Sequence, residues 1–482
     1  MEDPSRIATQ TDRPLEPDSE TLRAWLRAAE NLVIEHLATL AQQPSWDTEG
    51  ALAVAQGLVE PIPRTGRPID AVLARLLPAI TKSFNTIGPG YLAYIPGGGI
   101  PSAGVADLIA CETNRFVNVS MAAPALARME TLVLEWLCEL MGLPKGSGGI
   151  WTSGGSLSNL AAIVAARVEL LGEELEGGRL YFADETHASV PKAARVAGFP
   201  ERALRRIPVD DRLRMIPAAL EQSIIEDRGQ GLRPFLIIAN AGTTNTGAID
   251  PIAEVVAIAR RHGVWAHADA AYGGFFRIVP EAAARFAGIE EYDSITLDPH
   301  KGLFLPYGTG CLLVRDPESL RRAHGGHEAS YLQDVSGSAG VPNMTDFSAE
   351  LSRDFRGLRL WLPLQLHGID AFVQQLSEKL ALTRYAYERL REEPLIEILD
   401  EPQLSIVAFS VRPPAGHRLD ADAFGAELLA RVNARRRVFL SSTRIRGRYV
   451  LRICIVSFRT HEDRVRDAVD ALIEEARALA RG

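Results

Sequence analysis

The sequence predicts an α/β fold in which helices cover both faces of a large, mostly parallel β-sheet, followed by a small C-terminal α+β domain. Between residues 179 and 315, short apolar segments typical of buried strands alternate with helical patterns. This alternation indicates a parallel sheet, because each parallel crossover needs a connection that is usually a helix. After residue 369, long helical patterns alternate with a few strand patterns, which predicts the smaller domain.

The composition is typical of a globular chain that can bury a large core, with 482 residues of which 46% are apolar and 23% charged. The formal net charge is −9 and no basic block occurs, so we expect neither nucleic acid nor a membrane surface as a partner. The four cysteines lie far apart without a CxxC pair, which fits a reducing cytoplasm.

Neither a membrane segment nor a metal site is expected. The chain begins with a polar, acidic stretch instead of an apolar signal core. The longest apolar stretch, residues 125–143, is interrupted by charged residues, which indicates an amphipathic helix that cannot span a bilayer. Two histidine pairs, His262/His267 and His324/His327, have no cysteine nearby, so neither is predicted to bind a metal.

The N-terminal region is predicted to be helical after a tail. Residues 1–18 are rich in proline and acidic residues, which predicts a flexible tail. A helix is expected to begin at Ser19, with Ser19 as its cap and apolar residues at helical spacing up to Leu37. A helix this apolar at the start of a chain needs a surface to pack on, and a partner subunit is one candidate. Residues 19–87 form this helical segment.

Two glycine-rich stretches are candidate ligand-binding segments. In residues 88–101, tyrosines lie close to the three glycines 97–99, which indicates either backbone that approaches a ligand or a simple surface loop. In residues 153–159, Ser-Gly-Gly-Ser-Leu-Ser-Asn opens an alanine-rich helix. Free amides at a helix start can bind a phosphate, although a serine-capped helix after a glycine turn has the same pattern.

Polar residues follow the predicted strands at the positions where parallel sheets bind ligands, beyond the carboxyl ends. These residues are His187, Thr243, Asp269 and Asp298, each of which comes soon after an apolar segment. Taken singly, Asp269 could cap a turn and His187 could be an ordinary core or surface histidine. Their shared location favours a binding site.

Lys301 lies in an unusual setting. Within residues 294–311, apolar residues precede a His-Lys pair, and glycines and apolar residues follow it. Only five of the 52 basic residues are lysines, so arginine is the usual surface cation of this chain. A lysine in an apolar pocket with a polar neighbour can act as an amine nucleophile towards a carbonyl. The alternative is an accident of composition.

Taken together, these parts match the needs of one cofactor, pyridoxal 5′-phosphate. Lys301 can form a Schiff base with its aldehyde, and the turn at Gly154, Gly155 and Ser156 can hold its phosphate. Asp269 can keep the pyridine nitrogen protonated, so that the ring accepts electrons. A flat side chain such as His187 can stack on the ring face.

The sequence resembles the group II pyridoxal-phosphate-dependent decarboxylases, the family of aromatic-L-amino-acid decarboxylase and glutamate decarboxylase. The resemblance runs from about residue 20 to the C-terminus and rests on the motifs at 153–159, 267–274 and 298–301. It implies a fold type I homodimer with sites at the interface. Residues 19–87 would embrace the partner, residues 88–368 would form a large cofactor-binding domain with a seven-stranded sheet, and residues 369–482 the small domain.

By position in the motifs, the resemblance implies that Lys301 is the Schiff-base lysine, that Asp269 pairs with the pyridine nitrogen and that His187 stacks on the ring. Tyr331 matches the loop tyrosine that protonates the carbanion after carbon dioxide leaves. The full implied cofactor set is Gly154, Gly155, Ser156, His187, Thr243, Asp269, Ala271, Asp298, His300 and Lys301, and the implied substrate residues are Tyr94, Pro96, Gly97 and Arg452.

Departures from the aromatic-decarboxylase pattern concern the substrate more than the reaction. Gly97 stands where threonine is usual and Gly302 where tryptophan is common. Asp298 replaces an asparagine near the phosphate, where a negative charge is unfavourable unless paired. No cation for a second substrate carboxylate is evident, which predicts an aromatic or other neutral apolar amino acid. Tyr331 favours simple decarboxylation, whereas aldehyde formation by oxidative deamination, or transamination, is the alternative.

Overall fold

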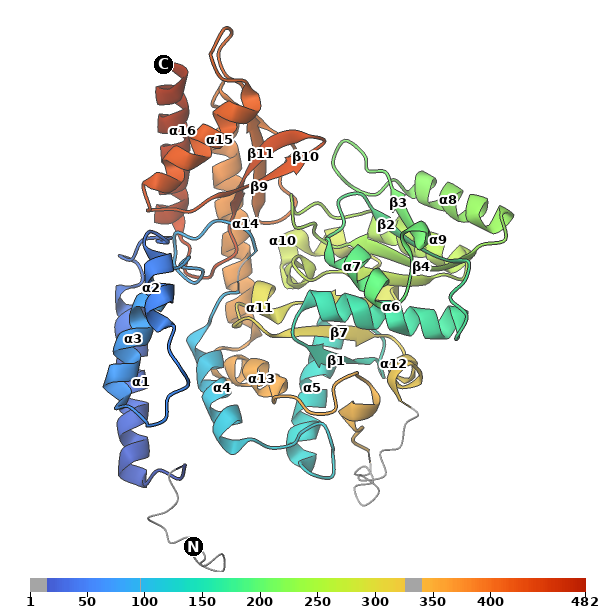
Figure 1. Ribbon diagram of the computed structural model, residues 1–482. Helices are drawn as coiled ribbons and strands as arrows, with labels where there is room; N and C mark the ends of the chain where they lie inside the picture. Colours follow the sequence, from blue (N-terminus) through green and yellow to red (C-terminus); the bar gives the residue numbers. More distant parts are fainter. Residues whose placement is uncertain (1–14, 96, 326–339) are drawn as a thin grey trace, which may run out of the picture.

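The structure is a computed structural model that describes residues 15–95, 97–325 and 340–482. Figure 1 shows a large α/β domain, a smaller domain made by the C-terminal part of the chain, and a group of N-terminal helices at one side. A mostly parallel seven-stranded sheet and a separate four-stranded antiparallel sheet confirm the predicted fold class. Within the described residues, no helix is long and apolar enough to cross a membrane.

The N-terminal helices bury none of their residues. They are α1 (Ser19–Thr39), α2 (Ala51–Leu58) and α3 (Ile69–Thr81). Helix α1 begins where predicted, but its cap is Asp18 and not Ser19: the Asp18 carboxylate accepts a hydrogen bond from the backbone N–H of Thr21 at 2.7 Å. A carboxylate in this position satisfies one of the free amides at the helix start and suits the positive end of the helix dipole.

The large sheet has the strand order β1-β7-β6-β5-β4-β2-β3. All neighbouring pairs from β6 to β3 are parallel, whereas β7 is antiparallel to both β6 and β1. The strands are β1 (Gly148–Thr152), β2 (Gly178–Ala183), β3 (Leu204–Ile207), β4 (Arg233–Asn240), β5 (Trp265–Asp269), β6 (Ser294–Leu297) and β7 (Gly310–Val314).

Strand β1 was not expected, because the sequence around Gly149 has the composition of a turn. A Cβ atom on Gly149 would stand 2.2 Å from the carbonyl oxygen of Leu312 on β7. Because Gly149 has no side chain, the edge strand can approach its neighbour closely. Glycine suits a turn as well as such a strand, so the glycines alone did not reveal the strand.

Alternate strand residues face two different cores, as expected for a sheet buried on both faces. Leu180 and Phe182 of β2 pack with apolar residues of α6 and α7, whereas Tyr181 of β2 faces α8 and α9. The helices of this domain are α4 (Pro101–Thr113), α5 (Pro124–Leu140), α6 (Gly155–Leu171), α7 (Ser189–Val196), α8 (Pro217–Gly229), α9 (Ile252–Arg261), α10 (Pro280–Ala283), α11 (Pro299–Gly302), α12 (Pro317–His324) and α13 (Arg356–His367).

The small domain has an antiparallel sheet with the order β10-β11-β9-β8. Strand β10 begins at Ser441, and Phe439 just before it makes an isolated bridge with Tyr91. The elements are α14 (Ile369–Arg391), β8 (Ile396–Ile398), β9 (Ile406–Val411), α15 (Ala421–Ala434), β10 (Ser441–Ile445), β11 (Arg448–Cys454) and α16 (Glu462–Ala480).

Helix α14 joins the two domains. Its first half, with Phe372 and Leu376, packs in the core of the large domain, while Leu382 and Leu390 from its second half pack in the core of the small domain. Because one helix of 23 residues belongs to both cores, the small domain is held at a defined position beside the large sheet.

Candidate active site

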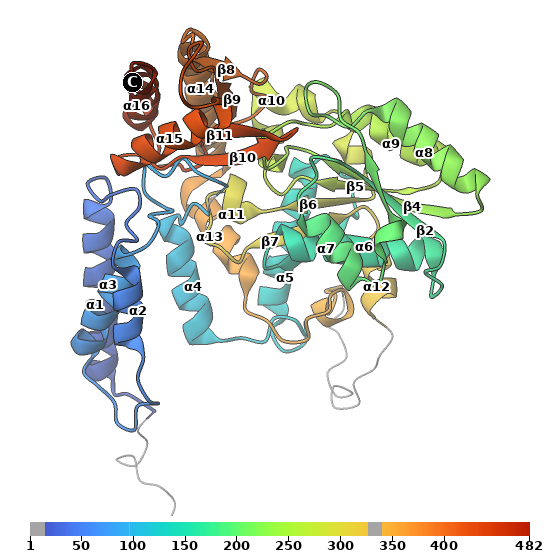
Figure 2. The ribbon, with the colours of Figure 1, turned by 45° about the horizontal axis from the view of Figure 1, so that its top comes forward.

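A cavity of about 250 Å³ lies at the carboxyl ends of the parallel strands. Figure 2 shows α11, the short helix after β6, on the side of the large sheet nearest the C-terminal domain. All members of the predicted cofactor set line this cavity: Gly154, Gly155, Ser156, His187, Thr243, Asp269, Ala271, Asp298, His300 and Lys301. Segments that follow five different strands therefore meet at one place, as the strand-end argument requires.

Size alone would not identify this site. Two larger cavities, of about 660 and 890 Å³, lie elsewhere in the described part of the chain. Arg285 lines the first, and Cys138 and Lys145 line the second. Among the described residues, neither lining contains both a lysine and an aspartate, so neither offers the combination of groups found in the smaller cavity.

Lys301 makes an ion pair with Asp298, its neighbour one turn earlier in the chain. The Nζ atom lies 2.8 Å from Asp298 Oδ2. The lysine side chain is 21% exposed towards the cavity side, whereas the Asp298 side chain is only 2% exposed. The negative charge that looked unfavourable near a phosphate is thus offset by a cation. The second oxygen, Asp298 Oδ1, is buried and has no hydrogen-bond partner among the described residues.

His300 is held in a single tautomer. Its Nδ1 lies 2.7 Å from the carbonyl oxygen of Thr309, which can only accept, so Nδ1 carries the hydrogen. Burial lowers the pKa of His300, although the Asp298 carboxylate opposes this effect. The ring is therefore neutral at pH 7, and its Nε2 faces Asp298 Oδ2 at 3.7 Å.

The start of α6 provides free backbone donors. Gly154 precedes the helix without a capping side chain, which argues against the serine-cap alternative. No acceptor within the described residues pairs with the backbone N–H groups of Gly155 and Ser156. A Cβ atom on Gly155 would lie 3.0 Å from Ala271 Cβ and 3.1 Å from Asp298 Oδ2, so glycine allows this helix start to reach the strand ends. An anion such as a phosphate fits here.

Asp269 closes β5 and faces the same cavity. Its Oδ2 accepts a hydrogen bond from Asn159 Nδ2 at 2.9 Å, and its Oδ1 accepts one from the backbone N–H of Ala271 at 3.2 Å. Both donors are uncharged, so they orient the carboxylate without neutralising it. A protonated ring nitrogen is the partner that such a carboxylate suits.

His187 is also fixed by its neighbours. The backbone N–H of Ser189 donates to Nδ1 at 3.2 Å, and the Ser189 hydroxyl lies 2.9 Å from the same atom. Burial lowers the pKa of His187, while the charge of Asp269 opposes the effect. Because Nδ1 accepts from an amide, the neutral ring carries its hydrogen on Nε2. Thr243, on the cavity wall, accepts from the backbone N–H of Ala248 at 3.1 Å.

Of the predicted substrate residues that the structure describes, Tyr94, Gly97 and Arg452, none lines this cavity. Arg452 is buried on β11, where its guanidinium donates to Thr244 O at 2.8 Å and to Ser441 Oγ at 3.1 Å. Thr244 lines the cavity, so Arg452 stands behind its wall. Tyr94 is half exposed and its backbone N–H donates to Ser441 Oγ at 3.3 Å. Two further predicted residues, Pro96 and Tyr331, lie outside the described residues.

The glycines 97–99 pack closely against the lysine segment, so this stretch is not a simple surface loop. The Gly98 N–H donates to His300 O at 3.2 Å and to Leu305 O at 3.1 Å. A Cβ atom on Gly98 would stand 2.4 Å from Phe304 Cα. Arg459 of the small domain, not foreseen from the sequence, donates to Gly98 O at 3.0 Å. The loop is therefore clamped between the two domains.

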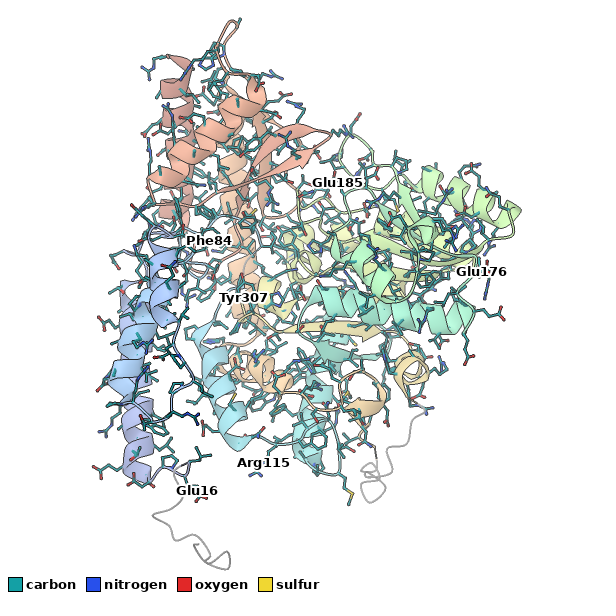
Figure 3. All side chains as sticks on the ribbon, viewed as in Figure 1. Glu16, Phe84, Arg115, Glu176, Glu185 and Tyr307 are labelled. Carbon is teal, nitrogen blue, oxygen red and sulfur yellow. The ribbon has the colours of Figure 1, made fainter. Side chains whose placement is uncertain are left out.

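Gly97 is also next to an aromatic side chain. A Cβ atom on Gly97 would lie 3.2 Å from the ring of Tyr307, which is labelled in Figure 3 and is 58% exposed. The Tyr307 ring in turn lies 5.8 Å from the ring of His300. A threonine at position 97 would thus require the exposed Tyr307 side chain to shift slightly.

Sequence reasoning missed several polar residues at this site, above all Asn159 and Ser189, which line the cavity. Asn159 closes the quoted motif 153–159 and follows Gly155 by four positions, so it lies on the same face of α6 as the free amides. That spacing was the available signal. Ser189 follows His187 by two positions, a spacing typical of local side-chain contacts at turns.

Comparisons with known proteins agree with this geometry. A family model, the pyridoxal-dependent decarboxylase conserved domain, matches residues 57–412. An aromatic-L-amino-acid decarboxylase of Bacillus atrophaeus is 32% identical over 467 residues, covering 96% of this chain and 97% of that protein. A phenylacetaldehyde synthase of Arabidopsis thaliana is 28% identical over 478 residues, covering 96% and 97%. The crystal structure of Oryza sativa TDC with PLP and tryptamine matches with a TM-score of 0.90 at 28% identity, covering 96% of this chain and 99% of that chain.

The residues present fit the cofactor that these names imply. The cavity contains a lysine, a carboxylate held by neutral donors, and a helix start whose free amides suit a phosphate. The family match covers well over half of the chain and includes all these residues. The chain therefore belongs to the group II pyridoxal-phosphate-dependent decarboxylases and is a carboxy-lyase of amino acids with pyridoxal phosphate as its cofactor.

Proposed function

We propose that this chain decarboxylates an L-amino acid with an aromatic or another neutral apolar side chain, releasing the amine and carbon dioxide. The observation that carries the proposal is the meeting of Lys301, Asp269 and the open start of α6 in one cavity. Each of these groups alone could have an ordinary structural role, but a decarboxylating site with this cofactor needs all three at once.

Bound pyridoxal phosphate supplies an aldehyde that takes up an amine and a ring that accepts the electrons left when carbon dioxide departs. The free amides of Gly155 and Ser156 would hold the phosphate, since they have no other acceptor among the described residues. Asp269 would keep the ring nitrogen protonated, and His187 would support the ring face. The neutral donors on Asp269 leave its charge available for this role.

Lys301 would provide the amine that anchors the cofactor and returns when the product leaves. Its Nζ lies 2.8 Å from Asp298 Oδ2, so a carboxylate stands beside the free lysine and can orient it. A lysine that is released from a covalent bond in a partly buried site needs such a partner, because an isolated buried ammonium is unfavourable.

His187 is a candidate proton donor to the substrate. Ser189 occupies its Nδ1, which leaves the hydrogen on Nε2. Delivery of a proton to a carbon that has just lost carbon dioxide needs the protonated ring, which returns to this neutral form when the proton has left. Tyr331 stays the second predicted donor on the basis of its motif position.

A neutral substrate fits the charges around the cavity. Among the described residues that line it, Lys301 is the single lysine or arginine, and this side chain would be used to anchor the cofactor. A second substrate carboxylate would thus lack a partner. Tyr94 and Tyr307 do not line the cavity, but both lie at the glycine loop and are 49% and 58% exposed, which leaves aromatic surface accessible there. The names of the aromatic-L-amino-acid decarboxylase and the tryptamine-bound TDC point to the same class.

The direct test supplies the purified, cofactor-loaded protein with a panel of aromatic, aliphatic and dicarboxylic L-amino acids and quantifies carbon dioxide and amine. We expect equal amounts of both products from an aromatic or apolar amino acid. The Lys301→Ala variant is the matched control and should release neither. Preferential turnover of glutamate or aspartate would contradict the proposed substrate class, and no release from any amino acid would contradict the reaction.

Oxidative deamination to an aldehyde is the second candidate, favoured by the relationship to a phenylacetaldehyde synthase. The two reactions differ in their products, because aldehyde formation consumes oxygen and releases ammonia and peroxide together with carbon dioxide. An oxygen electrode and a peroxide assay on the same panel separate them. We expect amine without peroxide from the natural chain and a shift towards peroxide in the Tyr331→Phe variant.

We propose that the protein is a homodimer in which residues 19–87 pack on the partner subunit. Helix α1 has apolar residues such as Trp25, which is 44% exposed, and Ile34, which is 59% exposed, and it buries none of its residues in the single chain. Such an apolar helix requires a covering surface. Sedimentation should give a dimer, Trp25→Asp should weaken it, and Ile225→Asp, at an exposed apolar position on α8, should not.

A further inference from the structure

Asn159 lies at the centre of a buried hydrogen-bond network beneath the cofactor cavity. Its side-chain Nδ2 donates to Asp269 Oδ2 at 2.9 Å and to Ser189 Oγ at 3.1 Å. Its Oδ1 accepts from Thr296 Oγ1 at 2.9 Å and lies 3.1 Å from His267 Nε2. Asn159 is 1% exposed. The amide thus uses both of its hydrogens and both acceptor positions of its oxygen, which is its full bonding capacity.

On one side of the network, the bond directions follow from Asp269. Asp269 can only accept, so the amide nitrogen of Asn159 faces it, and the amide oxygen faces His267 Nε2, which must carry the hydrogen of the neutral ring. His267 Nδ1 therefore accepts from the Ser294 hydroxyl at 2.8 Å, and Ser294 Oγ accepts from the indole nitrogen of Trp265, also at 2.8 Å. Burial lowers the pKa of His267 to about 4, so this ring is neutral at pH 7.

The other side of the network ends at His187. Because Asp269 can only accept, the amide nitrogen of Asn159 must face it, and that nitrogen also donates to Ser189 Oγ. The Ser189 hydroxyl hydrogen is then free to point to His187 Nδ1 at 2.9 Å. The orientation of a single amide thus determines where the hydrogens lie at Asp269 and supports the tautomer of His187.

We infer that Asn159 is a positioning residue for the cofactor: it orients the Asp269 carboxylate as an acceptor for the ring nitrogen and supports the Nε2-protonated form of His187. This inference rests on the roles that the proposed function gives to those two residues. His267 acts indirectly, through Asn159. Its hydrogen bond to Asn159 Oδ1 prevents a flip of the amide that would exchange the oxygen and the nitrogen.

An amide suits this position better than its isosteres. A carboxylate at position 159 would place a second negative charge 2.9 Å from Asp269 Oδ2, and two carboxylates at that distance cannot both stay ionised. A shorter hydroxyl side chain would lose at least one of the bonds to Asp269 and Ser189, leaving a buried acceptor without its partner.

The test replaces Asn159 by aspartate, which keeps the shape and exchanges the donor for an acceptor. The dissociation constant of pyridoxal phosphate is measured from its bound absorbance at several pH values between 5 and 8, for the variant and the natural chain in parallel. At pH 8 we expect the variant to bind roughly tenfold to hundredfold more weakly. Towards pH 5 the introduced carboxyl takes up a proton and can donate to Asp269, so the ratio of the two constants should approach one.

Two results would overturn the inference. One is an unchanged dissociation constant in Asn159→Asp across the pH range. The other is a weakening of the same size at every pH, since a purely structural defect would not be relieved by protonation. If Asn159→Asp does not fold, as judged by circular dichroism, Asn159→Ser takes its place. It should bind the cofactor more weakly at all pH values, with the bound absorbance band shifted, and unaltered binding and absorbance would count against the role.

Two controls separate this inference from the proposed function. Asn433→Asp makes the same exchange at a buried amide that bonds the backbone of Leu440 in the small domain, and it should leave the dissociation constant of the cofactor unchanged. Asp269→Asn removes the carboxylate itself. If Asp269→Asn leaves binding and absorbance unchanged, the role of Asp269 in the proposed function is wrong. If Asp269→Asn impairs them and Asn159→Asp does not, the inference about Asn159 alone is wrong.

Discussion

Lys301 and Lys379 are two of the five lysines in this chain, and both pair with a carboxylate close in sequence. Lys301 Nζ lies 2.8 Å from Asp298 Oδ2, and Lys379 Nζ lies 3.0 Å from Glu378 Oε2. Lys379 is the more buried of the two, with a side chain that is 0% exposed against 21% for Lys301. By burial alone, Lys379 would be the better candidate for an unusual lysine.

The surroundings distinguish the two lysines. Lys379 on α14 also donates to the carbonyl oxygen of Thr460, and Thr460 Oγ1 donates to Pro89 O at 2.9 Å. It therefore joins the start of the small domain to segments far away in the sequence. Lys301 faces a cavity shared with Asp269 and the free amides of α6. A reactive lysine needs space for a partner molecule and groups that recognise it, and burial provides neither.

The largest expected effect is that of Lys301→Ala. The variant should lose the visible absorbance of the bound cofactor and at least about a thousandfold of its activity, because the anchoring amine is gone. Absorbance spectra and amine release measure both losses. The comparison between the two lysines would break if Lys379→Met, with a side chain of similar length, caused the same spectral loss, or if Lys301→Ala kept the absorbance.

Lys379→Met should instead act on stability. The substitution leaves the Thr460 carbonyl without its donor and Glu378 without its cation, and removal of one partner from a buried polar contact costs about 2–4 kcal/mol. Urea denaturation measures the change in the free energy of unfolding. The folded variant should bind the cofactor with its normal dissociation constant. A stability equal to that of the natural chain would show that Lys379 does not hold the two domains together.

Substitutions of the two carboxylate partners, Asp298 and Glu378, should show the same division between cofactor binding and stability, with smaller effects. Asp298→Asn retains an oxygen for Lys301 and adds a donor near the start of α6, so we expect the affinity for pyridoxal phosphate to change by less than about tenfold. Glu378→Gln should lower the free energy of unfolding by about 1–2 kcal/mol, since Glu378 also bonds His461 at 2.7 Å. Titration with the cofactor and urea denaturation are used to measure both variants. A loss of stability in Asp298→Asn without one in Glu378→Gln would contradict this prediction.

The smallest effect is a dependence on pH. Burial lowers the pKa of Lys379 below its ordinary value of 10.5. At pH values between the lowered pKa of the folded chain and 10.5, Lys379 is protonated in the unfolded chain but not in the folded chain. The stability that Lys379 contributes therefore rises with pH in this range and is lost as pH falls. The difference in unfolding free energy between the natural chain and Lys379→Met should therefore shift in favour of the natural chain as pH approaches 10.5. A difference that does not change with pH would contradict this.

Much of the fold could be predicted because its signals are local. Helix α1 begins at Ser19, as expected, and Asp269 and Lys301 come at the end of β5 and just after β6, two strands formed by apolar segments visible in the sequence. Strand β1 was missed because its glycines indicate a turn as well as a closely packed edge strand. The shared position of α14 between two cores was also missed, because periodicity reports that a face is buried and not which core it joins.

The candidate cofactor residues could be picked out from their own motifs, since a glycine turn at a helix start and polar residues at strand ends are patterns of a few residues. All members of the predicted cofactor set line one cavity. The sequence did not reveal the partners of those side chains. Asp298 is paired with Lys301, and Arg459 clamps the glycine loop from the small domain, and neither contact follows from residue type alone.

What the sequence by itself determined is the chemistry: a lysine, an acid and an anion site on an α/β scaffold, each encoded within one short segment. What only the tertiary structure decided is which groups touch. Asn159 and Asp269 are 110 positions apart, and Asn159 and Thr296 are 137 apart. Contacts over such separations depend on the order of the strands and on the packing of α6 against them, which local propensity and periodicity do not specify.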